Sequence, residues 1–160
     1  MAKEVIVTAI LIISSVIAVV AFVNAIISSV YDLSNSYNSL ANNMGDQLKT
    51  AIEIVFIHQD GNNVSVWIKN VGSTNIPISQ LKYSDIFILS PSGYSNPVFE
   101  SISKPSWNCT LANENDDTWN RGETLNISIN FDTLQTGNYQ MTFFLYNGVS
   151  ASDKFSKSVS

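Results

Sequence analysis

The chain has 160 residues, a formal net charge of −5, and charged side chains at only 13% of its positions, about half the share in an average soluble domain. Eight Lys and Arg residues cannot supply the basic surface that neutralises phosphates, so nucleic acid is excluded as a partner. One cysteine excludes an internal disulfide and a Cys-based zinc cage, and one histidine argues against a Ser-His-Asp or His-metal enzyme.

The first predicted element is a long uncharged run. No charged side chain lies between Glu4 and Asp32, and residues 5–31 contain neither Gly nor Pro. About 20 apolar residues are enough to cross about 30 Å of hydrocarbon. We therefore predict a transmembrane helix with membrane lipid as a partner. An ordinary secretory signal peptide has a basic region before a shorter apolar stretch, so cleavage by signal peptidase is not expected.

The helical pattern continues beyond the apolar run as one stripe at helical spacing. We expect a continuous helix from about residue 3 to about residue 48, roughly 70 Å long, within a first domain at residues 1–50. The stripe either packs onto the chain's own globular domain or drives self-association in a bundle. A helix that is half membrane-embedded and half amphipathic favours self-association through residues Leu33, Tyr37, Leu40, Met44 and Leu48.

The orientation follows from the basic residues. Lys3 is the only one near the N-terminal flank, which favours a cytoplasmic N-terminus and an extracytoplasmic remainder. Three Asn-x-Ser/Thr sequons lie after residue 50, at Asn63, Asn108 and Asn126, and are candidate N-glycosylation sites. They agree with an extracellular location.

Residues 51–160 form a second domain in which the apolar period changes from 3.6 to 2. Strands are predicted at 51–58 and 64–70 around a hairpin turn at 60–63, and at 84–89. Further strands are predicted at 97–102, 107–111, 125–131 and 139–146, with a C-terminal edge strand. About seven short strands with regular turns predict an immunoglobulin-like sandwich. The fold class is therefore α+β, a long pilin-like helix followed by an all-β domain.

Few residues in this domain suggest chemistry. Oxygen ligands from Glu114, Asp116 and Asp117 could hold calcium, but the spacing does not match an EF-hand and also suits a solvated loop. Cys109 is expected to be a buried small hydrophobe. The three tryptophans are expected to pack in the core, with an exposed aromatic patch as the alternative. No phosphate loop, nucleophile elbow or catalytic carboxylate pair is present, so we expect no enzyme activity and no cofactor.

The layout and three segments resemble the FlaG/FlaF (ArlG/ArlF) family of archaellum accessory proteins. Residues 60–73, DGNNVSVWIKNVGS, match a hairpin that ends in the V-K-N-x-G-S-like pattern of that family. Residues 78–81 and 84–88 are similar to its next segment, and residues 121–125, RGETL, to its C-terminal half. The Ser-Asp-Ile-Phe run at 84–87 favours the FlaG type.

The resemblance implies a static, membrane-anchored part of the archaellum with its C-terminal domain in the pseudoperiplasm. In that family, FlaF-type domains bind the S-layer protein, and FlaG-type proteins self-assemble and act with FlaF. The implied partners are therefore a second copy, a related accessory protein and the S-layer protein.

Two alternatives remain. One is a type IV pilin-like or archaellin filament subunit, in which an acidic residue such as Glu4 meets the N-terminus of a neighbouring subunit. Such subunits are made with a leader that has a basic residue and Gly before the cleavage site, and residues 1–3 contain no such leader unless it was removed beforehand. Glu4 equally suits the membrane surface. The other alternative is a stand-alone surface adhesion sandwich.

Overall fold

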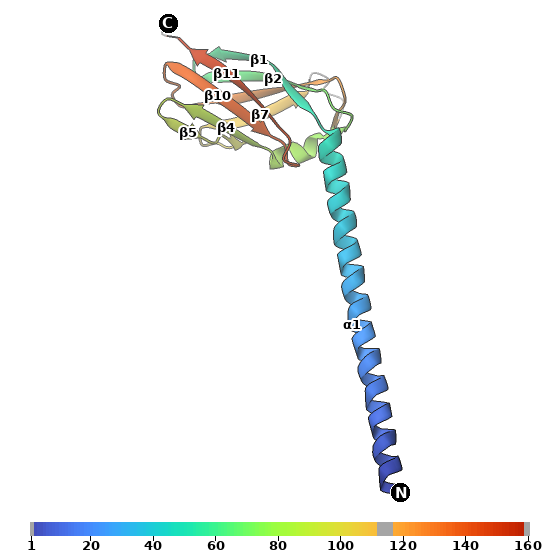
Figure 1. Cartoon of the computed structure of the whole chain (residues 1–160). Helices are drawn as coiled ribbons and strands as arrows, with labels where there is room; N and C mark the ends of the chain where they lie inside the picture. Colours follow the sequence, from blue (N-terminus) through green and yellow to red (C-terminus); the bar gives the residue numbers. More distant parts are fainter. Residues whose placement is uncertain (1, 112–116, 159–160) are drawn as a thin grey trace. The chain divides into compact units, whose positions relative to one another are not determined.

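The computed structural model describes residues 2–111 and 117–158 (Figure 1). By their contacts, the residues form two compact units that divide between Asn43 and Met44. The change from helix to strand comes several residues later, after Lys49. The last turns of the helix thus belong by contact to the β-rich unit, which we call the head.

The helix α1 spans Ala2–Lys49, 48 residues without a break, and none of them is buried. It is the one helix in the described residues that is long and apolar enough to cross a membrane. Its hydroxyl groups bond to the preceding turn: Ser14 Oγ donates to the Ile10 carbonyl at 2.7 Å and Ser29 Oγ to that of Ala25 at 3.0 Å. Such bonds satisfy hydroxyls that hydrocarbon could not.

The described part of the head consists of short strands with one 3-10 helix, η1 (Figure 1). The first hairpin turns at Gly61, whose φ of +57° suits glycine. The elements that follow α1 are β1 (Ile52–Asp60), β2 (Asn63–Asn70), β3 (Ile76–Pro77), η1 (Ile78–Tyr83), β4 (Asp85–Ser90), β5 (Gly93–Ser95), β6 (Val98–Phe99), β7 (Ser106–Leu111), β8 (Thr118–Trp119), β9 (Thr124–Asn130), β10 (Gly137–Phe144) and β11 (Ser150–Lys157).

Two main sheets pack face to face. One has the strand order β1-β2-β9-β7-β6 and the other β11-β10-β4-β5, while β3 and β8 pair separately. Strict alternation places one face of each sheet in the core. On β9, for example, Leu125, Ile127 and Ile129 are fully buried, and on β10 Met141 and Phe143 are. The predicted sandwich behind a long apolar helix is therefore confirmed.

Two details differ from the sequence prediction. The strand predicted at 97–102 is shorter, because Glu100 adopts a positive φ of 47° and ends β6 at Phe99. The segments β3, β5 and β8 were not predicted. Each has two or three residues, too few to show a period.

Asn70, at the end of β2, is a fully buried polar residue with every side-chain group bonded. Its Nδ2 donates to the carbonyls of Thr74 at 2.9 Å and Trp119 at 3.1 Å, and its Oδ1 accepts from Gly72 N at 3.1 Å. Its main chain bonds to Gly122 and Glu123. Through its side-chain amide Asn70 joins the end of β2 to the following loop and to β8, and through its main chain to the turn before β9.

Replacing Asn70 by Ala should destabilise the head by about 2 to 4 kcal/mol, because buried carbonyls lose their donors. The measurement is urea unfolding of the full chain in detergent, followed by tryptophan fluorescence. Asn75→Ala is the matched control, since Asn75 is exposed in the same loop. Equal stability of the two variants would contradict the role given to Asn70.

Candidate functional surfaces

The surface of α1 is the largest apolar surface among the described residues. Large apolar side chains from Val5 to Val30 are 44–68% exposed. The predicted stripe continues this surface toward the C-terminal end of the helix. Its members are all exposed in the single chain: Leu33 (59%), Tyr37 (68%), Leu40 (56%), Met44 (53%) and Leu48 (86%).

Glu4 lies in the first turn of α1 and is exposed. A carboxylate there interacts favourably with the positive end of the helix dipole. The Glu4 carbonyl accepts a bond from Thr8 Oγ1 at 2.8 Å, so the backbone is helical at this point. Its role in contact with a neighbouring subunit stays a prediction.

The C-terminal end of α1 is capped by the loop that follows β2. The Lys49 carbonyl accepts a hydrogen bond from Ser73 N at 2.8 Å, and the Ala51 carbonyl accepts from Val71 N and Gly72 N at 2.9 Å. The last carbonyls of a helix have no partner within it. Ser73 supplies such a partner to Lys49 from about twenty residues further along the chain, while Val71 and Gly72 bond to Ala51 just after the helix.

A second set of bonds fixes the same turn to the β10–β11 hairpin. Gln47 Nε2 donates to the Asn147 carbonyl, and Asn147 Nδ2 donates to Thr50 Oγ1 at 3.1 Å. Thr50 is 5% exposed, and its hydroxyl donates to the Asp46 carbonyl at 2.7 Å. Burial, and then the Asp46 carboxylate, raise the pKa of Tyr146. The last turn of α1 is thus held at two places on the head.

The sequence did not predict these bonds between the C-terminal end of α1 and the head, which we call the junction. Residues 71–75 read as a connecting loop, although residues 70–73 belong to the segment that carried the family resemblance. Gly72 is the residue in the sequence that could have indicated this close contact. A Cβ at this position would lie 2.5 Å from the Lys49 carbonyl oxygen and closer still to Ala51 N. The backbone therefore approaches the helix end more closely than any other residue type allows.

The sequons lie on the outer face of the five-stranded sheet, in different environments. Asn63 begins β2 beside the hairpin turn and is exposed, and Asn108 is exposed on β7. Asn126 is half-buried on the central strand β9 between Trp67 and Thr110. Its Oδ1 is buried and accepts no hydrogen bond from the described residues. Glycosylation of all three stays a prediction. The exposed side chains of Asn63 and Asn108 are more accessible to a glycosylating enzyme than that of Asn126.

The remaining predicted residues give no site. Glu114 and Asp116 lie outside the described residues, and Asp117 is exposed just before β8, so the calcium site stays a prediction. Cys109 is half-buried on β7. Burial, and then the nearby Glu100 carboxylate, raise the pKa of its thiol to about 11, so the thiolate is scarce at neutral pH. Trp107 and Trp119 are core residues, whereas Trp67 is half-buried on the outer face.

These features define a class of protein, an all-β sandwich head whose N-terminal strand follows one long apolar helix. The family model described as archaeal-type flagellin matches residues 2–155. An uncharacterized protein of Archaeoglobus fulgidus is 40% identical over 164 aligned positions, which cover 98% of this chain and 99% of the relative. The chain belongs to the archaeal-type flagellin family.

Two solved structures share the fold of the head. The archaellum periplasmic stator protein FlaG from Sulfolobus acidocaldarius aligns with a TM-score of 0.58 and 22% identity, covering 66% of this chain and 99% of that one. The stator protein complex of FlaF and FlaG from the same organism gives a TM-score of 0.56 and 22% identity, covering 65% and 87%. The resemblance drawn from the motifs is confirmed, and at this identity the two structures establish the fold.

Gly72→Ala should destabilise the junction by about 1 to 3 kcal/mol, because backbone atoms that meet the new Cβ cannot move aside without breaking the cap. Thermal unfolding of the full chain in detergent measures the effect. Gly45→Ala is the control, since a Cβ at Gly45 in α1 meets nothing within 4 Å. We expect that control to be neutral or stabilising. A Gly72 variant as stable as the control would exclude a tight junction.

Proposed function

We propose that the chain is a non-enzymatic, membrane-anchored structural component of the archaellum with a stator-like role. In this proposal α1 spans the cell membrane and the head lies outside it. The fold that the head shares with FlaG is the observation that carries the proposal. A helix long and apolar enough to span the membrane, within a family of archaeal-type flagellins, supports it.

A static part of a rotary machine must transmit force between its anchor and its head without yielding. The junction suits that task. Loop 71–73 and the β10–β11 hairpin both bond to the last turn and end of the helix. Several short bonds on two sides of one turn resist bending better than a flexible linker does.

The proposed partners follow from the surfaces. A second copy would bind along the apolar stripe of α1, which has no other cover among the described residues. A related accessory protein is proposed because the FlaG of Sulfolobus acidocaldarius is found in a complex with FlaF. A link to the S-layer protein, direct or through that partner, completes the proposal.

A filament subunit is the second candidate function. The description of the matching family, archaeal-type flagellin, favours it, and so does Glu4 at the start of a long apolar helix. The two functions predict different locations. A stator stays in the cell membrane, whereas a subunit leaves with the filament.

Shearing the filaments from native cells separates the two functions. We expect an antibody to the head to detect the protein in the membrane fraction and not in the sheared filaments. Deletion of its gene should leave filaments visible by electron microscopy on cells that no longer swim. Protein in the sheared fraction, with loss of filaments on deletion, would instead establish the filament subunit.

Self-association of the helix can be tested by charge. Leu33→Asp with Leu40→Asp places two carboxylates on the stripe and should reduce chemical cross-linking of the full chain in membrane vesicles by about tenfold or more. Asn35→Asp with Asn42→Asp adds the same charge about 200° around the helix and is the matched control. Equal cross-linking of the two double variants would show that the stripe does not bind a second copy.

A further inference from the structure

Two groups of exposed apolar side chains lie on opposite outer faces of the sandwich. The first, which we call the bulge patch, lies on the five-stranded sheet and consists of the exposed apolar Val55 and Phe56 with two rings beside Phe56, those of the exposed, polar His58 and the half-buried Trp67. The second, the groove patch, lies on the four-stranded sheet and consists of Phe87, Leu89, Tyr94 and Phe144. Contiguous apolar patches on a soluble face indicate binding surfaces.

The bulge patch projects from its sheet. The register of β1 against β2 runs from Ile54↔Ile68 to Phe56↔Trp67, so Val55 is an extra residue in a β-bulge. Val55 and Phe56 are 59% and 56% exposed as a result. The Phe56 ring lies 5.4 Å from the Trp67 ring and stacks 6.3 Å from His58, measured between centroids. The Phe56 side chain therefore projects from the sheet and packs against the rings of Trp67 and His58.

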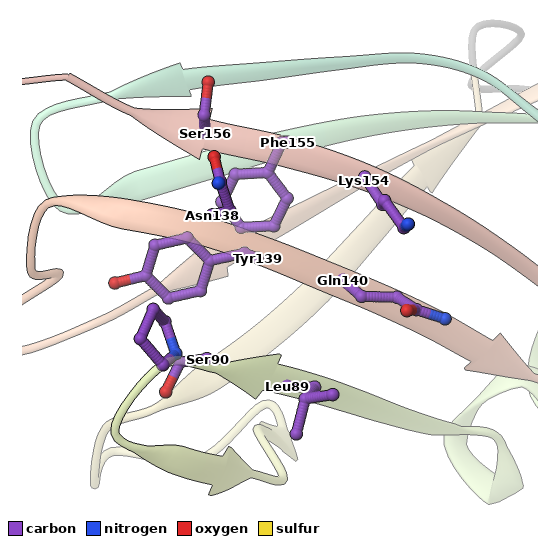
Figure 2. Close-up of a pocket in the computed structure, with 9 residues that line it drawn as sticks. Leu89, Ser90, Asn138, Tyr139, Gln140, Lys154, Phe155 and Ser156 are labelled. Atoms are coloured by element: carbon purple, nitrogen blue, oxygen red, sulfur yellow. The ribbon is translucent and has the colours of Figure 1, made fainter.

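The groove patch is hollowed. A hollow of about 570 Å³ crosses β4, β10 and β11 and is lined in part by Leu89, Asn138 and Gln140 (Figure 2). A second hollow, of about 280 Å³, shares Leu89 and Gln140 with it and continues to Tyr94 and Phe87. Tyr94 is 81% exposed at its edge, and Phe87 meets Phe144 edge-on at 5.7 Å.

We propose that the bulge patch of one copy packs into the groove patch of the next, so that heads associate head to tail. The inference rests on the proposed function, in which all copies are anchored in one membrane with the same orientation, and it names the head contact of the self-assembly. Because the two patches differ and face opposite ways, the contact is heterologous. Repeating it produces a ring or an open row of heads.

Three observations favour a second copy as the occupant of the groove. The chain itself carries both an apolar projection and an apolar hollow. Among the residues that line the two hollows, Lys154 is the only charged one, so docking removes little charge from water. Acidic Glu53 and Asp60 flank the patch on the bulge strand. Glu53 lies opposite Lys69 of β2, so Asp60 is the charge that remains to complement Lys154.

Two single variants test the contact. Phe56→Asp places a carboxylate on the bulge patch, and Tyr94→Asp places one on the groove patch. Both side chains are exposed, so the head should stay folded, which near-ultraviolet circular dichroism checks. Val55→Asp and Leu89→Asp replace them if either variant unfolds. Ile102→Asp is the control, since this fully exposed apolar residue belongs to neither patch.

The measurement is sedimentation velocity in detergent of the full chain carrying Leu33→Asp and Leu40→Asp, a parent chain in which the helix stripe does not contribute to association. Each variant added to this parent should self-associate at least about tenfold more weakly than the parent alone and the control. An equimolar mixture of Phe56→Asp and Tyr94→Asp copies should form dimers and nothing larger, because one intact bulge patch meets one intact groove patch. Only a heterologous contact gives this rescue.

Other results would overturn the inference. A mixture that stays monomeric, or an effect of only one variant, would indicate a contact of one patch with itself or with another partner. If the parent with Leu33→Asp and Leu40→Asp is already monomeric, the helix alone carries self-association. The proposed head contact is then wrong, whereas the proposed function is unaffected. If the protein is found in the sheared filaments, the proposed function is wrong, whatever the sedimentation experiment shows about the head contact.

Discussion

The structure depends on how one long helix ends. A helix of 48 residues leaves its final carbonyls without partners inside the helix, and here the last of them, that of Lys49, bonds to the head. Ser73 N and the amides of Val71 and Gly72 bond to the carbonyls of Lys49 and Ala51. Together with the bonds of Gln47 and Thr50 to Asn147, this cap fixes the last turn of the helix to the β-sandwich.

The cap in turn depends on Asn70. Its buried amide fixes the loop through Gly72 and Thr74 and ties it to Trp119 in the core. A fully bonded polar group in the interior specifies one arrangement, because any other arrangement leaves carbonyls without donors. The segment that carried the family resemblance is therefore the segment that joins helix to head, which gives a physical reason for its Asn and Gly.

The shortage of charge has two separate causes. The helix lacks charge over residues 5–31, as a segment proposed to lie in hydrocarbon must. The head also has few charges, and the middle of its five-stranded sheet shows Asn, Ser and Thr on the outer face: Asn108 pairs through Ser128 with Ser65, and Thr110 pairs with Asn126. These groups keep the surface hydrated without net charge. Against this background, the two apolar patches stand out, and they are the surfaces proposed to bind.

The sequence by itself determined the long helix, the main strands and the first hairpin turn, because each depends on a local period or on a turn residue such as Gly61. It also placed the core face of β9, where alternation is strict. Only the tertiary structure decided what residues 70–73 do, since their partners lie about twenty and about fifty residues away. It likewise decided that Phe56 projects at a bulge and that Trp67, expected in the core, is half-buried on the outer face. Strand pairing and sheet packing, not local pattern, determine which aromatic side chains reach the solvent.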